Sequence, residues 1–111
     1  MASEPILMIT GVDCAQGKEK EFNEWYNTNF AEIMSKVADV VRVDRYERVE
    51  DNEQLPRYIS IVELENIESV QKLVENENVS KLGKLYIEQG VNYGIQFHWA
   101  VRYKQIYSSA G

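Results

Sequence analysis

The stretch EFNEWYNTNFAEIMSKVADVVRVDRYE, residues 21–47, contains the clearest helix pattern of the sequence. Its apolar side chains recur at spacings of three and four, and they are Phe22, Trp25, Tyr26, Phe30, Ile33, Met34 and Val37. This spacing places them on one face and predicts an amphipathic helix. The run Asn27-Thr28-Asn29 puts three residues of poor helix propensity in its middle, so we expect a local weakening or a kink there.

Strand patterns lie on both sides of this helix. An apolar, β-branched run at residues 5–12 predicts a first strand. Residues 40–49 and 57–64 alternate with a period of two, and they are close enough in sequence to form a hairpin. A last strand is predicted over residues 94–107, where one parity is apolar and consists of Ile95, Phe97, Trp99, Val101 and Tyr103.

A second helical region lies before the last strand. Asn66 is a good N-cap, residues 76–78 interrupt the apolar stripe, and Gly90 stands where a helix often ends. The order βαββαβ predicts an α+β fold of the ferredoxin-like type, with a four-stranded antiparallel sheet and both helices on one face. The strands carry apolar groups at both parities, so we expect the other face to pack against a second copy. The result would be a homodimer that forms an α/β barrel.

Composition sets further limits. A chain of 111 residues with 44% hydrophobic content is expected to form one domain over residues 1–111, with a core at about 5–107. Eighteen acidic and 12 basic residues give a net charge of −6, which disfavours nucleic acid and anionic membranes as partners. No run is long enough to span a bilayer, no export signal is evident, and Cys14 is the only cysteine. These features predict a cytoplasmic protein.

Several short motifs lie within this framework, namely Trp25-Tyr26-Asn27, Arg42, Arg45-Tyr46-Glu47, Arg57-Tyr58 and Glu63-Leu64. Together they resemble the EthD-like group of the dimeric α/β-barrel superfamily, over residues 6–103. The resemblance implies a ferredoxin-like homodimer with a cleft between helices and sheet that receives small hydrophobic or aromatic molecules. Members of the superfamily include cofactor-free monooxygenases, polyketide cyclases, decarboxylases and lyases.

The sequence departs from the EthD-like pattern at three places. The histidine expected five residues after Trp25 is Phe30, the proline expected next is Glu32, and the later Pro-Gly is Ala38-Asp39. Phenylalanine neither accepts nor gives a proton, so no acid or base role carries over to position 30.

His98 is the only histidine, and it is therefore the candidate catalytic base. In an enzyme it would remove a proton from a phenolic or β-dicarbonyl substrate while a tyrosine hydroxyl or Arg45 stabilises the enolate. The alternative is a hydrogen-bonded histidine on the dimer-facing sheet. One histidine and one cysteine predict no metal site, and the scattered glycines predict no nucleotide cofactor.

The candidate ligand-binding residues combine aromatic rings with polar groups, and they are Trp25, Tyr26, Phe30, Arg45, Tyr46, Tyr58 and Trp99. Such sets serve either as core or as the lining of a small-molecule site. Three hypotheses follow. The first is a protein that binds a small hydrophobic or aromatic molecule, the second is a cofactor-independent enzyme that uses His98, and the third is a purely structural or interaction module.

Overall fold

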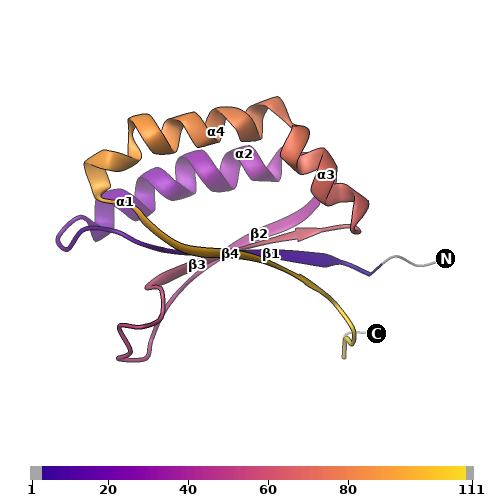
Figure 1. Cartoon of the computed structure of the whole chain (residues 1–111), viewed down its shortest axis with the longest axis horizontal. Coiled ribbons are helices and arrows are strands. Elements are labelled where there is room, and N and C mark those ends of the chain that lie inside the picture. Colours follow the sequence, from indigo (N-terminus) through magenta and orange to yellow (C-terminus); the bar gives the residue numbers. More distant parts are fainter. Residues whose placement is uncertain (1–3, 110–111) are drawn as a thin grey trace.

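The computed structural model describes residues 4–109 as four strands with helices on one side of the sheet (Figure 1). Residues 1–3 and 110–111, which the predicted domain includes, lie outside the described residues. The elements are β1 (Ile6–Asp13), α1 (Glu19–Tyr26), η1 (Asn27–Ala31), α2 (Glu32–Ser35), β2 (Val40–Glu47), β3 (Tyr58–Leu64), α3 (Glu68–Glu75), α4 (Glu77–Glu88), η2 (Gly90–Tyr93) and β4 (Gln96–Lys104). No helix in the described part of the chain is long and apolar enough to cross a membrane.

The sheet has the predicted ferredoxin-like topology. Its strand order is β2-β3-β1-β4, and all three neighbouring pairs are antiparallel. The helices cover one face of this sheet, as the α+β prediction required, and the opposite face carries no helix (Figure 1).

The predicted weak point in the first helix is a π-helical segment. Element η1 spans Asn27–Ala31 between the α-helical turns of α1 and α2. Asn29 compensates locally, because its side-chain amide donates to the Trp25 carbonyl oxygen at 2.8 Å. The second helical region is interrupted where the sequence indicated, at Asn76, whose side chain caps α4 by accepting from the amides of Asn78 and Val79.

Two details at the end of the chain differ from the sequence expectations. Helix α4 ends at Glu88, Gly90 begins a short 3₁₀ turn, and the left-handed glycine is Gly94, with φ of 62°. A side chain at Gly90 would meet Ile95 at 2.9 Å, so close approach explains this glycine. The last strand is also shorter than predicted, and it spans Gln96–Lys104.

A β-bulge at His98 separates aromatic residues that strict alternation would place on one face. In the β1–β4 register, Gly11 lies opposite Trp99 and Val12 lies opposite Phe97, so His98 is the extra residue. Phe97 packs on the Tyr86 ring at 5.3 Å on the helix side, whereas Trp99 lies on the side away from the helices.

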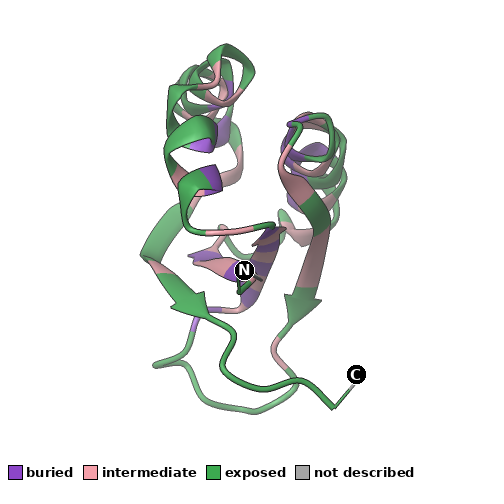
Figure 2. Cartoon of the chain, turned by 90° about the vertical axis from the view of Figure 1, so that its right-hand side faces the viewer, coloured by how far each residue is buried: buried purple, intermediate pink, exposed green. Residues whose placement is uncertain are grey.

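The hydrophobic core lies between the helices and the sheet (Figure 2). Its members come from the strands and from the inner faces of both helical regions: Ile6, Val12, Phe22, Trp25, Tyr26, Phe30, Met34, Val37, Tyr58, Val62, Leu64, Leu73 and Leu82. The uncovered side, here called the open face, carries a groove of about 790 Å³ lined by Leu7, Ile9, Ile59, Trp99, Val101 and Tyr103.

Candidate functional site

A cavity of about 210 Å³ lies between the first helix and the neighbouring strands. Asn23 of α1 and Asn27 of η1 line one wall, and the other wall comes from β2 and β3 through Arg45, Glu47 and Tyr58, with Tyr46 also in contact. This Arg45 cavity is the cleft between helix and sheet that we take as the candidate functional site.

Arg45 is held in this cavity by aromatic rings. Its guanidinium carbon lies 4.2 Å from the centroid of the Tyr26 ring, 5.6 Å from that of Phe22 and 5.7 Å from that of Tyr58. These distances are those of cation–π contacts. Burial lowers the pKa of the Arg45 guanidinium, although an arginine keeps its charge at neutral pH.

The hydrogen bonds of Arg45 are incomplete. Nη1 donates to the Asn27 side-chain oxygen at 2.8 Å, while Nε and Nη2 are buried without a partner. None of the ion pairs formed within residues 4–109 includes Arg45. Arg45 is half-buried, and unpaired buried donors on a cation are costly, so the surroundings of this side chain are unusual for a purely structural residue.

Several hydroxyls of the same layer are also buried without a hydrogen bond of good geometry, and they belong to Tyr26, Tyr58, Ser60 and Tyr86. The Asn23 amide lies near the Tyr58 hydroxyl, and the Tyr26 hydroxyl lies near that of Tyr86. Burial raises the pKa of Tyr58 and of Tyr86, so both phenols remain protonated at neutral pH. The layer thus holds protonated donors around a cation.

The predicted ligand residues on the first helix are core residues beside this cavity. Tyr26 is fully buried, and Phe30 and Trp25 are 6% and 9% exposed. Trp25 packs on the rings of Tyr86 and Tyr93, and its Nε1 donates to the Gln89 side-chain oxygen at 2.7 Å. Of these three residues only Tyr26 contacts Arg45, because its ring forms the surface on which the guanidinium stacks, and Trp25 and Phe30 pack on that ring.

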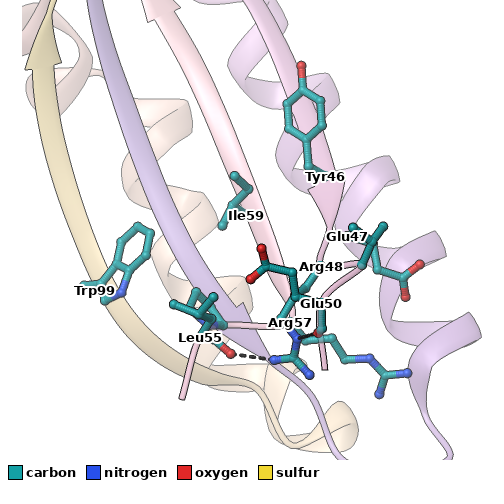
Figure 3. A pocket seen from close by; sticks show the side chains of 10 residues that line it. Tyr46, Glu47, Arg48, Glu50, Leu55, Arg57, Ile59 and Trp99 are labelled. Carbon is teal, nitrogen blue, oxygen red and sulfur yellow. Dashed lines mark hydrogen bonds between the residues drawn. The ribbon is translucent and has the colours of Figure 1, made fainter. Parts of the chain in front are cut away.

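Trp99 lies elsewhere, in a second pocket of about 350 Å³ at the open face, and Tyr46 lines this pocket as well as the Arg45 cavity (Figure 3). The loop between β2 and β3 closes this pocket through Leu55 and Pro56, and Arg48 ties the loop down by donating to the Leu55 carbonyl oxygen. The structure therefore divides the predicted ligand residues between the two faces of the sheet. Trp25, Tyr26, Phe30, Arg45 and Tyr58 lie together on the helix side.

His98, the predicted base, pairs with a carboxylate at the end of the sheet. Its Nε2 lies 2.6 Å from Asp13 Oδ2, and the other Asp13 oxygen accepts the Arg57 backbone amide at 2.6 Å. Partial burial alone would raise the pKa of Asp13, but the Arg57 and His98 hydrogen bonds hold it below its ordinary value. His98 does not line the Arg45 cavity.

Cys14 lies beside the same strand end and is not activated. Burial raises the pKa of its thiol, and the neighbouring Glu19 carboxylate adds to this effect. Within residues 4–109, no group of three or more His, Cys, Asp or Glu side chains is placed to hold a metal ion.

Sequence reasoning did not select the polar groups that complete the cavity lining, which are Asn23, Asn27 and Glu47, or the buried Ser60 opposite Arg45 in the sheet. The sequence marked Asn27 as a poor helix former and as part of the Trp25-Tyr26-Asn27 motif, but not as a residue of the site. In the structure its position at the start of the π-helical segment lets its side chain reach Arg45. A serine among the apolar residues of a buried strand was the available signal for Ser60.

No protein-family model matches the sequence, and no curated protein matches it. Solved structures do match over almost the whole chain. An EthD family protein from Bacillus halodurans is 11% identical with a TM-score of 0.65, covering 93% of this chain and 99% of that one. A cofactor-independent oxygenase from Streptomyces nogalater is 9% identical with a TM-score of 0.71, covering 98% and 100%.

A dimeric protein of unknown function and ferredoxin-like fold from Bacteroides fragilis is 13% identical with a TM-score of 0.61, covering 95% of this chain and 100% of that one. The chain has the ferredoxin-like fold. The resemblance to EthD-like proteins is confirmed at the level of the fold, because an EthD family protein is among the matching structures. At these identities the likeness extends to the fold alone.

Proposed function

We propose that the chain is a homodimeric protein that accommodates a small aromatic molecule in the Arg45 cavity. The observation that carries the proposal is that buried polar atoms of this cavity have no hydrogen-bond partner. Arg45 offers buried donors without partners in a space between helix and sheet, and Asn23, Asn27 and Tyr58 add polar groups to its walls. A concave space with aromatic walls and a few convergent polar groups is typical of small-molecule sites.

The open face supports the homodimer. Its groove is lined almost entirely by apolar side chains, and Trp99 and Tyr103 at its edge are 41% and 60% exposed in the single chain. Monomeric soluble proteins rarely leave a continuous apolar surface of this kind uncovered. A second sheet packed on this face would bury it, and the dimeric Bacteroides fragilis protein of the same fold is consistent with such an assembly.

Light scattering at micromolar concentration tests the assembly. We expect the mass of two chains, and a mass of one chain would contradict the packing of sheet on sheet. This measurement requires no knowledge of the ligand.

A cavity-filling variant tests the binding site. In Asn23→Phe the new ring would occupy the space beside Tyr58, so the variant should no longer bind small fluorinated aromatics in ¹⁹F NMR titrations. Asn92→Phe is the matched control, because Asn92 is exposed in η2 and does not line the cavity. Equal binding by both variants would show that the ligand binds outside the Arg45 cavity. No binding by the unmodified protein would favour a purely structural or interaction module.

The second candidate function is a cofactor-independent enzyme, and the Asp13–His98 pair favours it. A carboxylate that binds one imidazole nitrogen orients the ring and leaves the other nitrogen to act as a base. The oxygenase from Streptomyces nogalater has the same fold and is described as independent of cofactors. The test is His98→Ala in a turnover assay on any aromatic molecule found to bind: loss of turnover with an intact dimer supports the role, and unchanged turnover removes His98 from the mechanism.

A further inference from the structure

One nitrogen of the Arg45 guanidinium donates a hydrogen bond, and the two nitrogens along another edge have no hydrogen-bond partner. Nη1 donates to Asn27, whereas Nε and Nη2, which lie side by side along another edge of the planar group, have no acceptor. This edge presents two parallel N–H groups at the spacing of the two oxygens of a carboxylate. The free donors of Arg45 therefore match a bidentate partner.

The charges around this edge also favour an anion. No described carboxylate forms an ion pair with Arg45, and the groups packed on it are the rings of Tyr26, Phe22 and Tyr58. Glu47 lines the cavity without reaching the guanidinium. Its carboxylate points away from Trp99 and the pocket at the open face (Figure 3). A ligand that brings a negative charge would remove the cost of the unpaired cation.

The neighbouring hydroxyls add donors to the same layer. Ser60 lies opposite Arg45 in the β2–β3 register and is 1% exposed, and its hydroxyl has no partner. The hydroxyls of Tyr26 and Tyr58 are likewise buried without a hydrogen bond of good geometry. Buried polar groups of native proteins are normally satisfied, so this group of donors indicates a missing acceptor.

The volume limits the size of the acceptor. About 210 Å³ is less than the roughly 300–1,000 Å³ of sites for drug-sized ligands, so a single ring with a short substituent is the upper limit. The rings of Tyr26 and Tyr58 beside Arg45 suit an aromatic ligand.

We propose that the Nε–Nη2 edge of Arg45 binds the carboxylate of a small aromatic acid, with its ring between η1 and strands β2 and β3. The inference rests on the proposed function, because it assigns a ligand class to the same cavity. It also gives Arg45 a different role from that of a residue that only stacks on Tyr26 to hold the fold together.

Two matched probes test the ligand class, 4-fluorobenzoate and its neutral counterpart 4-fluorobenzamide, titrated into the intact protein by ¹⁹F NMR. The unmodified protein should bind the benzoate about 10- to 100-fold more tightly than the amide, as expected for charge-assisted hydrogen bonds to a partly buried guanidinium. Arg45→Gln should reduce benzoate binding to the level of the amide. Arg102→Gln, which removes the same charge from an exposed position on β4, should leave the preference unchanged.

The outcomes separate this inference from the proposed function. If the two probes bind with equal affinity and Asn23→Phe abolishes the binding of both, the carboxylate assignment is overturned. The proposed binding site in the Arg45 cavity is then still supported. Binding of neither probe would overturn both. A benzoate preference that survives Arg45→Gln would place the anion at another residue and overturn the assignment to Arg45.

Thermal unfolding of Arg45→Met without ligand tests whether the residue is structural instead. If Arg45 serves a ligand, replacing its charge and its two unpaired buried nitrogens by an apolar side chain should leave the unfolding temperature unchanged or raise it. A fall of several degrees at the same protein concentration would assign Arg45 to the fold and overturn the inference. Benzoate should raise the unfolding temperature of the unmodified protein and not that of Arg45→Met.

Discussion

The two faces of the sheet are built from the same strands, but one leaves buried polar groups without hydrogen bonds and the other leaves apolar side chains exposed. The helix face is covered, and its unsatisfied groups are polar: the Arg45 donors and the hydroxyls of Ser60 and Tyr58. The open face is uncovered, and it exposes apolar side chains, from Ile9 at the centre to Trp99 at the edge. Unpaired donors inside a layer indicate a small ligand, whereas an apolar surface outside it indicates a large partner.

The largest expected effect comes from a charge on the open face. Ile9 is central in the sheet, between Ile61 on β3 and Val101 on β4, so Ile9→Glu would bury a carboxylate between the two sheets of the proposed dimer. Burying an unpaired charge costs several kcal/mol, and a cost of about 3 kcal/mol weakens association more than 100-fold. We expect the mass of a single chain by light scattering at micromolar concentration.

Ile67→Glu is the control for that experiment. Ile67 is also apolar and is 66% exposed, but it lies beside α3 in the helical layer, away from the open face. This variant should keep the mass of the unmodified protein. If both variants behave alike, the two faces do not differ in association, and the comparison fails.

A smaller effect is expected from two glycines, one on each side of the molecule. A side chain at Gly11 on the open face would lie 2.6 Å from Pro56 Cγ and 3.3 Å from Trp99 Cε2, whereas one at Gly83 in α4 would meet nothing within 4 Å. Gly11→Ala should lower the free energy of unfolding by about 1–3 kcal/mol through overpacking. Gly83→Ala should raise it by about 0.5–1 kcal/mol through helix propensity.

Urea unfolding at one protein concentration measures both variants. The comparison requires opposite signs, because only the Gly11 site is closed by a loop packed on the sheet. A neutral Gly11→Ala would mean that Pro56 moves aside without cost, and the pocket beside Trp99 would then be adaptable rather than preformed.

The sequence was sufficient to predict the fold because its signals are local. The helical spacing of residues 22–37 and the alternation in Tyr58–Leu64 predict an element each, and their order limits the topology to the ferredoxin-like arrangement. The break in the first helix was also predictable, because Asn27-Thr28-Asn29 disfavours a regular helix whatever the tertiary contacts.

The site could be predicted only in part, since it depends on which strand residues share a face. Arg45 and Tyr58 were candidates by residue type, and they do meet on the helix side. Trp99 was grouped with them, and one extra residue at the His98 bulge places it on the open face while Phe97 faces the helices. A bulge shifts the alternation of a strand without a distinct sequence signal, so this division required the structure.

The smallest expected effect concerns the pair of Asp13 and His98, the residue at the bulge. The folded state lowers the pKa of Asp13 below its ordinary value of 3.8, so the folded protein binds this proton more weakly than the unfolded chain. The stabilisation is therefore present above pH 3.8 and is lost as the pH falls through the lowered pKa. Asp13→Asn removes the charge that His98 and the Arg57 amide contact, so it should reduce stability near pH 5.5.

The difference between Asp13→Asn and the unmodified protein should shrink as the pH is lowered from 5.5 to 3, because the native carboxylate then also begins to take up a proton. Urea unfolding at both pH values measures this, and Asp51→Asn in the exposed loop between β2 and β3 is the control. A constant difference across the range would show that geometry, not the carboxylate charge, is what Asp13 contributes. In that case the bulge that divides Phe97 from Trp99 depends on packing alone.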